Sequence, residues 1–190
     1  MPSIAFTRHL IPLLDDASVL IAASKTLRGR RRGPMPTLIP LHRAVVVACV
    51  SAWEAFVEEL VREALEALRP PGPPMGTWPA LNATARAAIG RFNTPNTDQI
   101  RILISDALGL TGIQDSWAWP GCVPADARGQ LQRVMDLRHA VAHGVNPRPE
   151  VDFAYATGLP RFFKRLGECS DRGVREYLVA TLGVANPWPP

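Results

Sequence analysis

The chain has 190 residues, of which 47% are hydrophobic, and a formal net charge of +4. This length suits one domain with a sizeable core, and this apolar content excludes a disordered chain. The longest apolar run covers residues 44–52 and is too short for the roughly 20 residues of a membrane-spanning helix. We therefore expect one domain over residues 1–190, with no membrane span and no secretion signal.

The chain opens on a predicted helix over residues 4–27. Pro12 should bend or restart this helix, because proline has no N–H to donate. A basic loop follows over residues 28–39, with its arginines at Arg28, Arg30, Arg31 and Arg32. These guanidinium groups are candidates for RNA contact, since arginine binds phosphate in a bidentate way. A solvated loop is the plainer interpretation, and a GC-rich genome would also favour arginine over lysine.

A long helix is predicted over residues 40–69, because apolar side chains recur there at steps of three and four residues. Glu58 and Arg62 form an i,i+4 pair of favourable orientation. A proline-rich loop over residues 70–79 ends the helix. Trp53 lies at the apolar edge of this helix, where a core position is more common than a base-stacking one.

Shorter helices are predicted over 80–92 and 97–109, the second capped by Thr97 or Asp98. Residues 110–124 are expected to form a packed loop. Further helices are predicted over 125–143, 150–168 and 172–182, before an extended tail at 184–190. No alternating strand pattern is present in the sequence. The sequence therefore predicts an all-α fold, an antiparallel helical bundle with additional short helices.

The segment around residues 136–144 concentrates groups that suit phosphodiester chemistry. His139 and His143 are four residues apart, so they share one face of the predicted helix, and Arg138 adjoins them. Histidine titrates near neutral pH and can exchange a proton, while arginine stays charged and can stabilise charge that develops on phosphorus. RNA supplies its own nucleophile, the 2′-OH. Gly144 stands where a helix C-terminal cap is expected.

These residues carry a family resemblance. The segment Arg-His-Ala-Val-Ala-His at 138–143 resembles the Arg-polar-x-x-x-His motif of HEPN proteins, which glycine commonly follows. The segment Ala-Trp-Glu-Ala-Phe-Val-Glu-Glu at 52–59 resembles the tryptophan–glutamate helix of the RiboL-PSP-HEPN branch. Residues 92–95 and 100–110 resemble its middle section. The resemblance covers roughly residues 40–180 in the expected order.

The resemblance implies a HEPN-like helical bundle that pairs as a two-fold dimer with one composite cleft. It also implies an endoribonuclease that needs no metal or cofactor, leaves 2′,3′-cyclic phosphate ends, and acts in the cytoplasm as a toxin or antiviral effector. Its expected partners are RNA, a second copy of the chain and an antitoxin protein.

The same resemblance assigns roles to particular residues. Arg138 would stabilise the phosphate and His143 would act as general acid or base. His139 fills a polar position that is often Asn or Asp in the family. Glu54 matches a helix acid that lies near the motif, and Asp136 is a second candidate supporting carboxylate.

Other interpretations remain open from the sequence alone. Arg138 could be a structural ion-pair partner of Glu54 or Asp136, and His143 could simply favour the helix dipole as a C-cap. His139 and His143 could bind a metal as an i,i+4 pair, although no third ligand is evident. The whole chain could be a non-catalytic RNA-binding or dimerisation module. Three cysteines without short spacing give neither a disulfide framework nor a zinc motif, which fits a reducing compartment.

Overall fold

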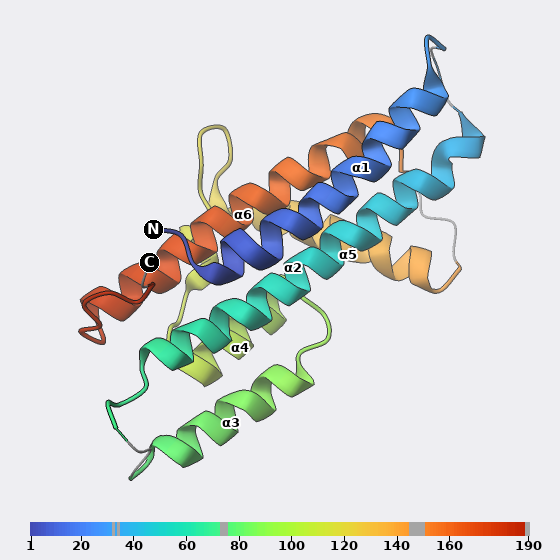
Figure 1. The fold of residues 1–190 in the computed structure, drawn as a ribbon. Coiled ribbons are helices and arrows are strands. Elements are labelled where there is room, and N and C mark those ends of the chain that lie inside the picture. The colour runs from blue at the N-terminus through green and yellow to red at the C-terminus, as the bar shows by residue number, and fades with distance from the viewer. Residues whose placement is uncertain (32, 34, 73–75, 145–150, 189–190) are drawn as a thin grey trace.

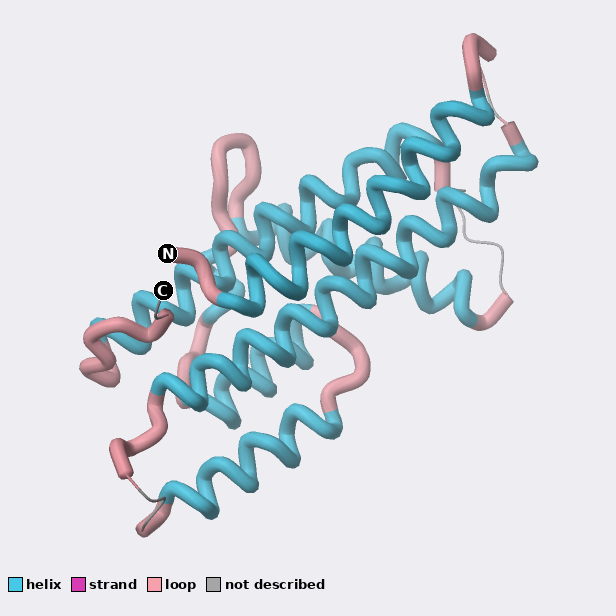
Figure 2. Tube along the Cα trace, in the orientation of Figure 1, coloured by secondary structure: helices cyan, strands magenta, loops and turns pink. Residues whose placement is uncertain are grey.

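A computed structural model describes residues 1–31, 33, 35–72, 76–144 and 151–188. Three long helices form its centre: α1 (Ile11–Arg28), α2 (Ile39–Ala67) and α6 (Phe153–Ala180). They pack side by side, with α2 and α6 running in the direction opposite to α1 (Figure 1). The described residues contain no strand, only an isolated bridge between Trp119 and Cys122. The predicted all-α fold is therefore confirmed (Figure 2).

The first helical run changes character at Pro12, as predicted. A π-helical turn, Ala5–Leu10, leads directly into α1, and Pro12, which has no N–H to donate, lies in the first turn of α1. The start of the chain is held by carboxylates from other helices. Glu63 accepts the N–H groups of Ile4 and Ala5, and Asp171 accepts that of Ser3.

The core is built around α2. Trp53 is fully buried, and its ring lies 5.5 Å from Phe56 and 6.0 Å from Phe163 between centroids. The Trp53 indole N–H donates to the Pro95 carbonyl at 3.1 Å, so its single polar atom is satisfied. The core role predicted for Trp53 is confirmed. The predicted ion pair between Glu58 and Arg62 is also present, at 2.8 Å.

Two shorter helices, α3 (Trp78–Arg91) and α4 (Thr97–Leu108), pack against each other and against α2. The predicted caps, Thr97 or Asp98, are wrong by one and two residues, because the N-cap is Asn96, whose side chain accepts the Gln99 N–H at 2.9 Å. Two short 3₁₀ helices, η2 (Pro36–Leu38) and η3 (Ile113–Ser116), lie within stretches predicted as loops. The range 28–39, predicted as a loop, therefore has helical residues at both ends, because α1 ends at Arg28 and η2 and α2 begin at Pro36 and Ile39.

Helix α5 (Pro124–Ala142) lies against α2, with further contacts to α4 and η3 (Figure 1). Pro124 stands at its first position, and the Asp126 carboxylate accepts the Val123 N–H. Its last turn is closed by Gly144, whose φ of 68° is left-handed and favours glycine. The boundaries and the terminal glycine agree with the sequence prediction.

The prediction of two final helices is wrong, because α6 is continuous from Phe153 to Ala180. The weak helix formers in its middle are used for packing. Ser170 accepts the indole N–H of the buried Trp117 at 2.9 Å. Gly167 lets the first helical run approach, since a Cβ there would lie 2.2 Å from the Leu10 side chain. Tertiary contacts therefore override the local propensity for a break.

The end of the described chain folds back onto the bundle. Trp188 is only 2% exposed and belongs to the hydrophobic core. None of the helices in the described part of the chain combines the length and the apolar character that a membrane crossing requires.

Replacing two of the glycines of α6, Gly167 and Gly158, should have opposite effects. Gly167→Val should destabilise the protein by about 1–3 kcal/mol, because the new side chain overpacks a buried contact. Gly158→Ala should raise stability by up to about 1 kcal/mol, since a Cβ there meets open space and alanine favours a helix. Urea unfolding followed by circular dichroism measures both changes. Equal stability of the two variants would contradict the close packing of α6 against the first helical run.

Candidate functional site

The candidate motif lies at the C-terminal end of α5, at the end of the bundle where α1 ends and α2 begins (Figure 1). Arg138 and His139 are in the last turns of the helix. His143 is its C-cap residue, and the His143 N–H donates to the His139 carbonyl at 3.1 Å. Gly144 follows in a left-handed conformation, and the His143 side chain at this helix end is exposed.

The two histidines form a close exposed pair. Both side chains are exposed to solvent, and their ring centroids are 4.3 Å apart with an interplanar angle of 53°. This contact confirms the shared helix face expected from their i,i+4 spacing. A solvent-facing imidazole pair can accept a proton at one ring and donate one from the other.

Arg138 has a different environment from the histidines. It is partly buried on the side of α5 that faces α2, where Glu54 is its neighbour. Burial raises the pKa of the Glu54 carboxyl, and the Arg138 charge opposes that rise. Among the described residues Arg138 forms no ion pair with Glu54 or Asp136, so its guanidinium is not locked to a carboxylate.

Helix geometry explains why one subunit separates these groups. Five residues at 100° per residue place Arg138 and His143 about 140° apart around α5. The inner side of the helix is fixed by its buried residues Ala127, Leu131 and Val134. Arg138 therefore lies near the packed side of α5, and the histidine pair lies on the solvent side.

Asp136 is not brought into the cluster by any direct contact. Its side chain is exposed and accepts a hydrogen bond from the Gln132 amide at 2.8 Å. That contact is local to the outer face of α5. A supporting role for Asp136 stays a prediction.

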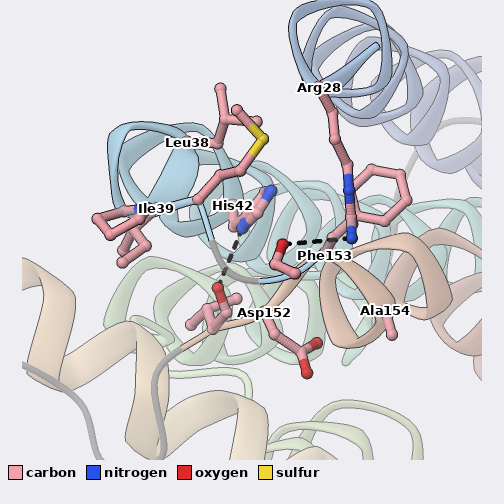
Figure 3. A pocket seen from close by; sticks show the side chains of 11 residues that line it. Arg28, Leu38, Ile39, His42, Asp152, Phe153 and Ala154 are labelled. Carbon is pink, nitrogen blue, oxygen red and sulfur yellow. Dashed lines mark hydrogen bonds between the residues drawn. The ribbon is translucent and has the colours of Figure 1, made fainter. Parts of the chain in front are cut away.

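The basic loop contributes one ordered arginine. The Arg28 guanidinium lies 5.1 Å from the centre of the Phe153 ring and donates to the carbonyls of Arg31 and Gly33 (Figure 3). Arg30 and Arg31 are exposed. Arg32 lies outside the described residues. Arg28 is thus occupied by local contacts, whereas Arg30 and Arg31 face solvent.

A small cavity of about 290 Å³ adjoins Arg28, between the start of α2 and the start of α6. The buried His42 borders it, and both of its ring nitrogens have partners. One contacts the Ser24 hydroxyl at 2.9 Å. The other contacts the Val151 carbonyl at 3.1 Å (Figure 3). The polar groups of this cavity are therefore used internally. His42 ties α1, α2 and the start of α6 together at the end of the bundle that carries the motif.

Other candidate chemistry is dispersed. In the part of the chain that the structure describes, no three His, Cys, Asp or Glu side chains are grouped as a metal site would require. Cys49, Cys122 and Cys169 are all free, and burial raises the pKa of the Cys49 thiol to about 12. Cys49 therefore stays a protonated core side chain at neutral pH.

Sequence reasoning missed a second arginine cluster. Arg133 on α5 and Arg161 and Arg165 on α6 border one open groove between these helices. Only the i,i+4 spacing of Arg161 and Arg165 could have signalled a shared face from the sequence. Arg133 lies beside Arg161 and Arg165 only because the fold brings α5 and α6 to the same groove.

The comparisons with known proteins gave one finding. The family model described as RiboL-PSP-HEPN matches residues 20–174, well over half of the chain. The match includes the Trp53–Glu54 segment of α2 and the whole of α5. No curated protein and no solved structure matches the chain significantly.

Replacing the Glu54 carboxyl should reveal the cost of burying its charge. The pKa of Glu54 is raised in the folded state, so the protein loses stability as pH rises through that pKa. Glu54→Gln, which has no charge to bury, should be more thermostable than the wild type at pH 7. The two proteins should converge below about pH 4, where the wild-type carboxyl is protonated in both the folded and unfolded states.

Melting temperatures measured from pH 3.5 to pH 7.5 test this prediction. Glu59→Gln on the same helix is a matched control, because the Glu59 carboxylate is already paired with Arg62. A Glu54→Gln variant that is less stable than the wild type at pH 7 would mean that attraction to Arg138 outweighs desolvation.

Proposed function

The chain belongs to the RiboL-PSP-HEPN family, and we propose that it is an endoribonuclease that cleaves single-stranded RNA without a metal ion. The observation that carries the proposal is the motif at the end of α5. It combines an exposed imidazole pair with an arginine that forms no ion pair with a carboxylate of the described residues. Those groups suffice for phosphodiester transfer within RNA, where the nucleophile belongs to the substrate.

The proposed reaction follows from these groups. An imidazole removes the proton of the ribose 2′-OH, and the 2′ oxygen bonds to the adjacent phosphorus. The bond from phosphorus to the 5′ oxygen breaks, and a second protonated imidazole donates a proton to that oxygen. The products are a 2′,3′-cyclic phosphate and a 5′-OH. The Arg138 guanidinium stabilises the extra negative charge of the five-coordinate phosphorus.

The separation around α5 favours a site shared by two subunits. Within one chain Arg138 and His143 point to sides of the helix about 140° apart. A two-fold axis beside the end of α5 would bring the arginine of one subunit toward the histidines of the other. The end of α5 suits a close approach, because Ala142 is small and exposed.

The biological setting that we propose is that of a toxin or an antiviral effector controlled by a partner protein. A cytoplasmic ribonuclease that needs no cofactor is active as soon as it folds, so a cell that makes it needs a separate restraint. An antitoxin protein that covers the exposed end of α5 would provide that restraint.

One observation favours a second candidate function. The partly buried position of Arg138 beside Glu54 would equally suit a structural arginine in a non-catalytic RNA-binding or dimerisation module. Such a module would bind RNA and leave it intact even as a dimer.

Removing either motif group should abolish cleavage. Arg138→Ala and His143→Ala should each lower the rate by at least about 10²-fold, because each removes charge stabilisation or proton transfer. Cleavage of a labelled single-stranded RNA in EDTA, with analysis of the cyclic phosphate ends, measures this. Arg91→Ala on α3 is a matched control with an exposed arginine far from α5 in the sequence. Full activity in both motif variants would refute the assignment, and intact RNA with the wild type would favour the module.

Mixing the two inactive variants tests whether the site is shared. If Arg138 of one subunit acts with His143 of the other, a mixed dimer of Arg138→Ala and His143→Ala keeps one complete site. Random exchange makes half of the dimers mixed, so activity should return to about a quarter of the wild-type level. Light scattering should give about twice the 20.7 kDa mass of the chain. A dimer whose mixture stays inactive would place both groups of each site in one subunit.

A further inference from the structure

A groove between α5 and α6 is separate from the motif at the end of α5. It encloses about 630 Å³ and is bounded at one end by the loop that holds Trp119 and Cys122. Three arginines border it: Arg133 from α5, and Arg161 and Arg165 from α6. Segments about 30 residues apart in the chain therefore direct their positive charge to one depression.

The charge of this groove is largely uncompensated. Arg133 and Arg161 are exposed and form no ion pair with any described residue. Arg165 pairs with Glu168 at 2.8 Å. Asp126 is the carboxylate among the lining residues, and it is already used to cap α5 through the Val123 N–H. Two free guanidinium groups thus face a solvent-filled channel, an arrangement that attracts a polyanion.

The shape of the groove suits an extended chain. Gly129 and Gly158 border it from the two helices, and a Cβ added at Gly158 would meet no atom within 4 Å. The absence of side chains at these positions keeps the channel open. At one end the partly exposed Trp119 ring packs edge-on against Phe162 at 6.1 Å, so its orientation is fixed. A fixed aromatic ring beside free arginines is the combination that single-stranded nucleic acids use, through stacking and phosphate contacts.

We propose that this groove holds the backbone of single-stranded RNA, with Arg133 and Arg161 on its phosphates and Trp119 against a base. This inference rests on the proposed function, because that function is what identifies the bound polyanion as RNA. Arg133 is six residues before His139, which corresponds to about 9 Å along the axis of α5. A strand held in the groove therefore runs beside the helix that ends in the motif, and the groove supplies affinity while the motif supplies chemistry.

Reversing the charge of the groove should weaken RNA binding. The variants are made in a His143→Ala background so that the RNA stays intact, and binding of a fluorescent single-stranded RNA is followed by anisotropy. Arg133→Glu with Arg161→Glu should bind at least about 10-fold more weakly and reduce the slope of log K against log salt by about 1.4, for two lost phosphate contacts. Arg86→Glu with Arg91→Glu on α3 is the charge-matched control and should retain its slope to within about 0.5.

A variant that keeps the charge tests the shape. Gly158→Leu should fill the channel and weaken RNA binding several-fold, while the melting temperature stays the same or rises, because leucine favours a helix over glycine. Gly158→Ala adds only a methyl group and should bind almost as the parent does. Loss of binding together with a preserved melting temperature supports occlusion of the groove, whereas unchanged binding in both the Leu and the charge-reversed variants overturns it.

The outcomes separate this inference from the proposed function. RNA that binds in the groove but is never cut by the wild-type dimer would remove the nuclease assignment and leave the groove standing. Cleavage that persists, with full RNA affinity, when the same charge reversal is made in the wild-type chain would remove the groove and leave the nuclease. Unchanged RNA affinity, combined with lost binding of an acidic peptide such as poly-glutamate, would assign the groove to a protein partner and overturn the RNA proposal.

Discussion

The burial of Trp53 fixes the rotation of α2, and the position of the candidate site depends on that rotation. Its ring is surrounded by Phe56, Phe163 and Trp117, and its N–H bonds the Pro95 carbonyl, so the helix has one orientation in which both the apolar ring and the polar atom are satisfied. The next residue in the chain, Glu54, then stands 100° away, on the side covered by α5. There it is partly desolvated and lies next to Arg138. Trp53 is thus a core residue that affects the candidate site indirectly, because it sets the position of Glu54 next to Arg138 on α5.

Helix periodicity sets the second constraint. Spacing of four residues brings His139 and His143 together on one face, whereas spacing of five residues turns Arg138 toward the bundle. The helix also ends at His143, because Gly144 adopts a left-handed conformation that closes the last turn. The imidazoles consequently lie at an exposed terminus and the guanidinium lies against α2. A second subunit could place its own arginine beside the histidines of the first, which one helix cannot do because its arginine and histidines lie on different sides.

The sequence predicted most of this framework. Periodic apolar positions located α2 and α5, Pro12 marked the change at the start of α1, and Gly144 marked the end of the motif helix. The errors have physical causes. A break was predicted between residues 168 and 172, inside α6. Ser170 and Gly167, both weak helix formers, are instead held within a continuous helix by contacts with Trp117 and Leu10 from distant segments. The relation between Arg138 and Glu54 came only from family resemblance, because residues 84 positions apart meet through packing that no local pattern encodes. The groove arginines escaped notice for the same reason.

If the motif is catalytic and the groove binds RNA, as we propose, the distribution of charge divides binding from catalysis. At the motif, the single guanidinium is partly compensated by Glu54, and the imidazoles are not permanent charges. Such a cluster attracts a ground-state polyanion weakly, yet it can respond when charge develops on phosphorus, which is the interaction that accelerates a reaction. Arg133 and Arg161 have no carboxylate partners among the described residues and face an open channel, so their attraction for phosphate is the same before and during the reaction. Uniform binding of that kind holds a substrate without raising the rate of its chemistry. In the ribonuclease that we propose, placing the two kinds of charge on different sides of α5 would let affinity for RNA change without changing the geometry at the scissile phosphate.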